Sequence, residues 1–165
     1  MSGGTMAEYA GRAGQYLSFN LGDGQYAIPV ARVEVVLEKQ PITRVPRARP
    51  WLRGVTNHRG SVIPVVDLKL RFGMGETPIA EGISIIVLQL DFDGDIVTVG
   101  MLADGVREVI DIETAELESA PDVGGKLDRK AIAAIGKKDG AFIVILDVDE
   151  AFATDGAAFA PDEAE

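Results

Sequence analysis

Short apolar runs separated by turns that contain glycine or proline recur along most of this chain. We count about ten such runs, with a turn signal every ~8–12 residues, a spacing typical of β-sandwiches and barrels. The runs are rich in valine and isoleucine, which favour strands. No alternation of strands with long helical patterns occurs, which argues against a doubly wound α/β fold. The sequence therefore predicts an all-β protein.

The clearest of these signals covers residues 51–68, where two apolar runs flank the polar turn Asn57-His58-Arg59-Gly60. This pattern predicts a β-hairpin, in which Gly60 supplies a backbone conformation that a residue with a Cβ would resist. The turn presents the Arg59 guanidinium on a short, fixed loop. Recognition residues tend to lie on such loops.

The remaining elements follow the same logic. Further strands are expected at residues 15–21, 25–30, 33–37, 42–45, 83–92, 96–102, 106–112, 131–136 and 142–148. The alternation in residues 15–21 predicts a half-buried strand, and short helical turns are expected at 67–72, 114–117 and 149–153. Residues 1–14 are predicted to be a disordered tail and residues 154–165 a flexible acidic tail, which leaves 15–153 as the folded part.

Composition limits the class of protein. A chain of 165 residues with 47% apolar residues suits one domain, or two small subdomains that share a core. The absence of cysteine excludes disulfides, thiolate metal sites and cysteine nucleophiles. No signal peptide is visible, and no apolar run approaches the ~18 residues of a membrane span. We therefore expect a soluble, cytoplasmic protein without direct membrane insertion.

The charge is unevenly distributed. A net charge of −10 argues against nucleic-acid binding, which needs a basic surface. Residues 44–71, however, carry seven basic side chains and one acidic one, a local net charge of +6. Two interpretations remain open: the arginines are solvated loop residues, or they form a basic strip for an acidic protein partner.

Candidate catalytic and metal sites are weak. His58 is the only histidine, and a triad would need it beside Ser61 and Asp67, but no G-x-S-x-G elbow occurs. We interpret His58 as an exposed turn residue. Residues 91–95 resemble a calcium loop, yet the twelfth position, which should be glutamate, is Leu102, so a hairpin turn is the better interpretation. The sequence predicts neither an enzyme nor a cofactor.

A second acidic group, at residues 147–150, follows a strand, and we expect it to cap a helix; a metal site there is the lesser alternative.

Two further patterns bear on binding. Val106 and Val109 lie three positions apart and would face opposite sides of a regular strand, so either one of them lies outside the core, as an apolar contact on a groove, or the backbone bulges. Residues 26–33 and 99–106 also resemble each other. This echo predicts two similar barrels related by a pseudo-two-fold axis, with chance similarity between valine-rich strands as the alternative.

Successive pieces of the chain resemble, in order, the CheW family of bacterial chemotaxis adaptors. The pieces are YLSFNLG (16–22), YAIPV (26–30), ITRVP (42–46), GVTNHRG (54–60), VIPVVDL (62–68), RFG (71–73), VGMLADGV (99–106) and IVILDV (143–148). The resemblance implies two intertwined five-stranded SH3-like barrels and no catalysis. It implies two partners: the cytoplasmic tip of a chemoreceptor and the regulatory domain of the chemotaxis histidine kinase.

The resemblance also implies where these partners bind. The receptor tip is expected in a groove between the barrels, and the kinase domain at one end of a barrel. The candidate partner-binding residues are Val33, Val35, Asn57, His58, Arg59, Gly60, Gly100, Val106 and Val109. Among these, Gly60 and Gly100 are expected to hold a turn or close packing. Alternatives to the adaptor itself are an adaptor of a variant pathway and a CheW-like domain of a longer adaptor–receiver protein.

The chain departs from the family pattern at two positions. Where the family shows V-x-E-V, this chain has its glutamate, Glu34, one position early, with Val35 in its place. In a strand, one position moves a side chain to the other face, so Glu34 is not expected to reach Arg59. The second departure is His58, where the family has an apolar or aromatic residue. Both lie near the implied groove and predict an altered binding surface.

Overall fold

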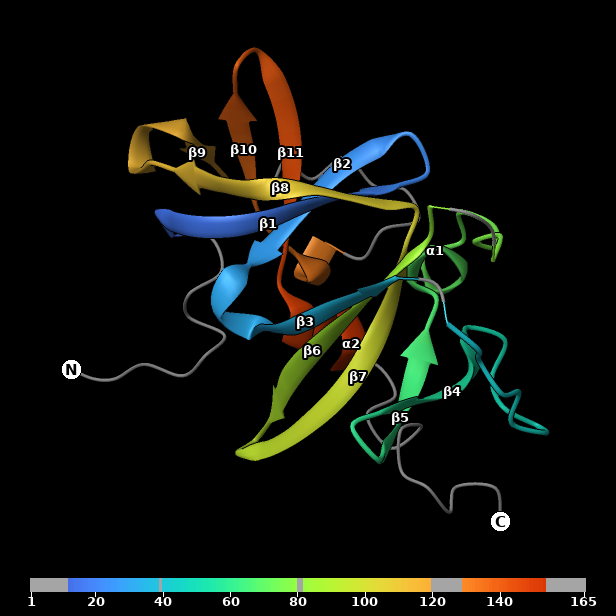
Figure 1. Ribbon diagram of the computed structural model, residues 1–165. Helices are drawn as coiled ribbons and strands as arrows, with labels where there is room; N and C mark the ends of the chain where they lie inside the picture. The colour runs from blue at the N-terminus through green and yellow to red at the C-terminus, as the bar shows by residue number, and fades with distance from the viewer. Residues whose placement is uncertain (1–11, 39, 80–81, 120–128, 154–165) are drawn as a thin grey trace.

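The structure is a computed structural model that describes residues 12–38, 40–79, 82–119 and 129–153 (Figure 1). The strands are β1 (Gly14–Leu21), β2 (Gly24–Pro29), β3 (Val33–Glu38), β4 (Leu52–His58), β5 (Ser61–Val66), β6 (Ser84–Phe92), β7 (Asp95–Ala103), β8 (Gly105–Ile112), β9 (Leu117–Glu118), β10 (Ile132–Lys138) and β11 (Ala141–Leu146). The helices are α1 (Leu68–Arg71) and α2 (Val148–Ala153), with 3₁₀ turns η2 (Val30–Arg32), η3 (Thr114–Glu116) and η4 (Arg129–Ala131).

The strands form two curled sheets, one above the other in Figure 1. The first barrel has the strand order β8-β1-β2-β11-β10-β9, and the second has the order β3-β6-β7-β5-β4. The chain begins in the first barrel, builds the second with β3 to β7, and returns to the first at β8. The barrels are therefore intertwined, as predicted, because neither is built from one continuous segment.

The two sheets are related by a pseudo-two-fold axis. In each sheet one pair of strands is parallel: Ile145 of β11 pairs with Ala27 of β2, and Val65 of β5 pairs with Gly100 of β7. Ala27 and Gly100 therefore occupy equivalent positions in the two sheets. The alignment of residues 26–33 with residues 99–106 also places Ala27 opposite Gly100. The echo therefore falls on structurally equivalent strands, in agreement with the prediction of two similar barrels.

A shared apolar core lies between the barrels. It contains Leu17, Phe19 and Leu21 of β1 together with Leu88 of β6 and Phe152 of α2, all buried. Tyr16, on the other face of β1, packs in a separate cluster inside the first barrel. The prediction of a half-buried β1 was wrong, because one face of the strand lines its own barrel and the other covers the second barrel.

Two other local predictions change in the structure. Residues 42–45 form no strand; the single bridge Thr43–Val55 is the only ladder contact there, because Pro41 and Pro46 each lack a backbone N–H donor. The spacing of Val106 and Val109 is explained by a bulge, since Phe19 pairs with Val106 and Leu17 with Val109. Three residues of β8 thus span two of β1.

Short helices follow β5 and β11, and an aspartate precedes each of them. Asp67 accepts hydrogen bonds from the backbone N–H groups of Lys69 and Leu70. Asp147 accepts one from Glu150, at a donor–acceptor distance of 3.2 Å. Both aspartates were predicted as caps, and N-capping satisfies amide donors that have no partner within the helix. Burial raises the pKa of the Asp147 carboxyl above its usual value.

A buried ion pair joins the barrels. Arg32, at the end of η2, is 1% exposed and pairs with Asp149 of α2. Its Nε donates to the Gln89 carbonyl of β6 at 3.1 Å, and the same carboxylate accepts the Asp91 backbone N–H at 2.8 Å. The Arg32 guanidinium therefore joins three parts of the chain. These are the segment that passes from β2 of the first barrel to β3 of the second, strand β6, and helix α2.

We expect Arg32→Met to destabilise the protein by about 3–5 kcal/mol, because it leaves the Asp149 carboxylate buried without its counter-charge. Urea denaturation followed by fluorescence of Trp51 measures the change. Lys137→Met is the control, since that side chain is 50% exposed and its loss should cost no more than about 1 kcal/mol. Equal stability of the two variants would contradict the role assigned to Arg32.

Candidate functional site

The β4–β5 hairpin ends in the two-residue loop Arg59-Gly60, between the paired residues His58 and Ser61. Both loop residues have positive φ, 55° for Arg59 and 83° for Gly60, which is the type I′ geometry that suits the twist of a hairpin. The Asn57 side chain fixes the loop by accepting the Gly60 N–H at 3.1 Å. The hairpin prediction is confirmed, and Gly60 holds the turn.

Arg59 is exposed on this fixed loop. Within the described part of the chain, its guanidinium forms no ion pair. Glu34 lies beside His58 instead, with its Oε2 3.2 Å from His58 Nε2. The prediction that Glu34 does not reach Arg59 agrees with this arrangement.

His58 is less exposed than predicted, with 11% of its side chain accessible. It lies at the last position of β4 and contacts Glu34 on β3, so the pair connects the two edge strands of the second barrel. Gln40, which follows β3, adds two hydrogen bonds to β4. It donates to the Thr56 hydroxyl and to the Asn57 carbonyl, both at 3.1 Å. The sequence analysis missed this contact between β3 and the hairpin, because it depends on barrel curvature.

The candidate valines divide into two kinds. Val33 and Val106 are half-buried and both pack against the shared core, at positions that the pseudo-two-fold axis makes equivalent. Val35 packs against the core of the second barrel, whereas Val109 is 50% exposed on β8. Val109 is thus the candidate valine with the most surface for a partner.

Gly100 lies inside the second barrel and is buried. A Cβ built there would stand 2.7 Å from Ile85 Cγ2. The expectation of close packing at Gly100 therefore agrees with its position, and any effect on binding would be transmitted through the barrel wall.

The structure does not assemble the triad considered for His58. Asp67 is fully buried at the opposite end of β5, where it binds Arg53 Nη1 at 2.9 Å and the Thr77 hydroxyl at 2.8 Å. Its carboxylate is occupied by the α1 cap and by the loop after α1. The chemistry of a nucleophile, histidine and carboxylate is therefore not available at this hairpin.

The acidic loops also have structural roles. Residues 91–95 form the β6–β7 hairpin, in which the Asp91 side chain accepts the Gly94 N–H at 2.8 Å, as expected for a turn. Within residues 12–38, 40–79, 82–119 and 129–153, no three acidic or histidine side chains gather as a metal site would require. No helix in these ranges is long and apolar enough to cross a membrane.

The first barrel carries a matching hairpin with different chemistry. The β10–β11 loop is Asp139-Gly140, with φ of 50° and 81°. Beside it, Lys138, at the position equivalent to His58, has its Nζ 3.3 Å from the carboxylate of Glu116 in η3. The Glu113 backbone N–H and Lys138 together hold the pKa of Glu116 below its usual value. The two hairpin loops thus have similar φ angles and differ in the charge of their side chains.

Comparison with known proteins assigns the fold to a family. The family model described as CheW-like domain matches residues 15–155. The chain belongs to the CheW-like family. Chemotaxis protein CheW of Klebsiella aerogenes is 28% identical over 88% of this chain and 87% of its own length. Chemotaxis protein CheW of Thermotoga maritima is 34% identical over 82% of this chain and 85% of its own length.

A solved structure agrees with this assignment. The scaffolding protein TtCheW from Thermoanaerobacter tengcongensis superimposes with a TM-score of 0.76 at 30% identity, covering 87% of this chain and 90% of that one. CheW proteins form a family of adaptors, and the general role of this chain is that of a chemotaxis adaptor. The predicted pair of SH3-like barrels is confirmed.

We expect Gly100→Ala to destabilise the protein by about 1–3 kcal/mol, because the new methyl group overpacks the barrel against Ile85. Gly60→Asn is the matched variant. A Cβ built at position 60 has no atom within 4 Å, and asparagine tolerates positive φ. Its cost should stay below about 1 kcal/mol. Urea denaturation measures both, and a larger loss for Gly60→Asn would contradict this division of roles.

Proposed function

We propose that this CheW-like protein is a cytoplasmic chemotaxis adaptor that bridges the cytoplasmic tips of chemoreceptors to the regulatory domain of the chemotaxis histidine kinase. The observation that carries the proposal is the agreement of the complete two-barrel fold with CheW proteins, together with an unpaired arginine on a rigid turn. An exposed guanidinium without a carboxylate partner in the described residues is available to a second protein.

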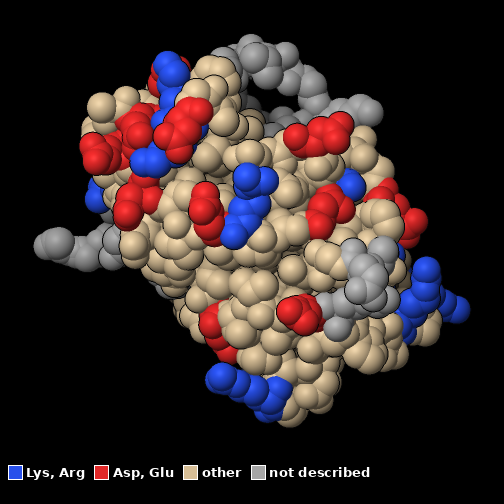
Figure 2. Space-filling model, turned by 45° about the horizontal axis from the view of Figure 1, so that its top comes forward, with Lys and Arg blue, Asp and Glu red and all other residues tan. Residues whose placement is uncertain are grey.

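The receptor tip is proposed to bind along the seam between the barrels. The β4–β5 hairpin contributes Asn57 and Arg59, and Val33 and Val109 contribute apolar surface. Figure 2 shows one face of the molecule, on which acidic and basic side chains are interspersed with uncharged ones. Apolar contacts surrounded by polar ones are the usual composition of a protein interface.

The kinase regulatory domain is proposed to bind an end of one barrel. Binding of two partners to one rigid body sets their relative geometry and raises the effective concentration of each for the other. Receptor state then changes kinase activity to the extent that it changes this geometry, which is a coupling between two binding sites. The adaptor itself needs no chemistry for this role.

The Glu34–His58 contact supports a second candidate, an adaptor of a variant pathway. This contact replaces the glutamate–arginine arrangement that the family resemblance implies and changes the surface next to Arg59. A relative with a different name, Protein FrzA of Myxococcus xanthus, is 32% identical over 67% of this chain. A receptor or kinase from another signalling system would then be the partner.

Calorimetric titration with the kinase regulatory domain from the same cell tests the adaptor role. Saturable one-to-one binding, followed by binding of a receptor cytoplasmic fragment to the complex, is expected. Absence of binding to both partners would overturn the proposal. Binding to the kinase domain without binding to the receptor would favour the variant pathway.

We expect Arg59→Glu to weaken receptor binding by about 5- to 50-fold, since it replaces an exposed positive charge by a negative one at the interface. Asp139→Lys is the matched control, because it reverses a charge on the equivalent turn of the other barrel. Pull-down with the receptor fragment measures both variants, and denaturation checks that both fold. Unchanged receptor binding by folded Arg59→Glu would reject the proposed surface.

A further inference from the structure

A loop rich in arginine and proline precedes β4 and lies beside it in Figure 1. Four arginines, Arg44, Arg47, Arg49 and Arg53, line one cavity of about 420 Å³ there, and Glu76 is its acidic member. The site lies at the start of β4, six residues before the turn that carries Arg59 at the other end of the strand. Arg53 is therefore about 20 Å from Arg59 along the strand.

The arginines of this cavity differ in what they bind. Arg53 is committed to the fold, because it contacts Asp67 at 2.9 Å, the Thr77 carbonyl at 2.7 Å and Glu76 at 3.4 Å. Among the described residues, Arg44 and Arg47 have no hydrogen bond or ion pair. Two positive charges therefore remain uncompensated beside a structural one.

Arg47 also has a backbone conformation that costs free energy. Its φ is 62°, and the Ala48 N–H donates to the Val45 carbonyl at 3.3 Å. Pro46 stands at the second position of this turn and Arg47 at the third, the position of a type II turn that favours glycine or asparagine. A non-glycine residue with a strained backbone is a reason to look for function at that residue.

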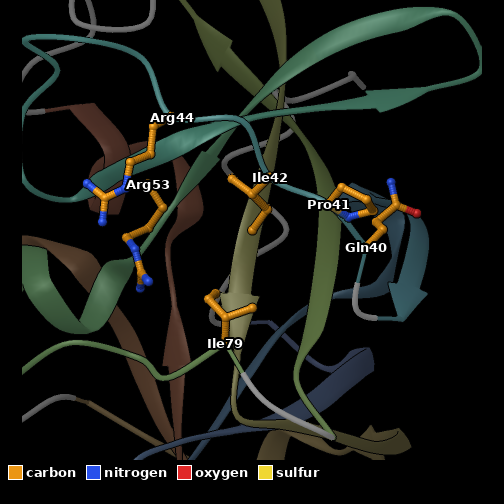
Figure 3. Close-up of a pocket in the computed structure, with 6 residues that line it drawn as sticks. All are labelled: Gln40, Pro41, Ile42, Arg44, Arg53 and Ile79. Atoms are coloured by element: carbon orange, nitrogen blue, oxygen red, sulfur yellow. The ribbon is translucent and has the colours of Figure 1, made fainter.

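An apolar cavity adjoins the arginines. It has a volume of about 480 Å³ and shares Arg44 and Arg53 with the first. Figure 3 shows Arg44 and Arg53 side by side at one end, with Ile42 and Ile79 pointing toward each other across the space. The combined surface offers guanidinium groups next to an aliphatic slot, and we call it the arginine pocket.

We propose that the arginine pocket binds an acidic segment of a partner protein, with carboxylates on Arg44 and Arg47 and an aliphatic side chain between Ile42 and Ile79. Charge complementarity supports this occupant, since Arg44, Arg47, Arg49 and Arg53 line the first cavity and Glu76 is the acidic residue of that lining. The acidic remainder of the chain opposes a nucleic-acid backbone, and the apolar slot has no counterpart in a phosphate chain. Of the two interpretations of the basic strip, this proposal adopts the protein-binding one.

The test uses the full chain and a fluorescein-labelled twelve-residue peptide made of four Glu-Glu-Leu repeats. Fluorescence anisotropy is expected to show saturable binding that weakens with salt. The Arg44→Gln/Arg47→Gly double variant should bind about tenfold more weakly, since it removes two charged contacts. Lys137→Gln, which removes a charge from the opposite barrel, should bind as the parent does.

Arg47→Gly alone separates binding from folding. Glycine adopts φ of 62° without a steric penalty, so this variant should unfold at the same or a higher urea concentration while binding the peptide more weakly. Loss of binding through unfolding is thereby distinguished from loss of the contact.

Three outcomes would overturn the proposal. These are equal binding by the double variant, equal binding of a Lys-Lys-Leu peptide, and equal binding of a Glu-Glu-Ser peptide, which would leave only a general anion site. The assay contains neither receptor nor kinase, so its failure leaves the proposed adaptor role untouched, and failure of the adaptor role leaves this result valid.

Discussion

A single buried guanidinium connects the parts of this molecule that the chain order separates. Arg32 stands where the chain leaves the first barrel, and it binds Asp149 on α2 and the Gln89 carbonyl of β6. Burial of two charges is costly and is offset only where geometry and further hydrogen bonds are good. The pair thus ties the segment after β2 to strand β6 and helix α2, and so joins the two barrels.

The other half of the molecule has a similar pair with the charges reversed. Lys69, in the first turn of α1, lies 3.2 Å from Asp104 at the β7–β8 crossing. The pseudo-two-fold axis makes Lys69 equivalent to Asp149, and it places Asp104 next to the equivalent of Arg32. In each half, an ion pair thus connects the segment that passes between the barrels to a short helix. The segment carries the positive charge in the Arg32–Asp149 pair and the negative charge in the Lys69–Asp104 pair.

The equivalent hairpins of the two barrels have similar backbones and different side chains. The loops Arg59-Gly60 and Asp139-Gly140 have nearly the same backbone angles, because both close a hairpin of the same twist. Their side chains differ in charge, and only the second barrel carries the loop with Arg44 and Arg47. The two barrels are therefore equivalent scaffolds that carry different charged side chains.

The sequence by itself determined the strands other than β9, the hairpin turns, the aspartate caps and the family, because these depend on local patterns of two to ten residues. It also indicated the pseudo-symmetry through residues 26–33 and 99–106. Only the tertiary structure decided that both faces of β1 are buried, that residues 42–45 form a single bridge, and that Glu34 contacts His58. These outcomes depend on which surfaces the curled sheets bring together, and such contacts between residues distant in sequence leave no periodic signal in the chain.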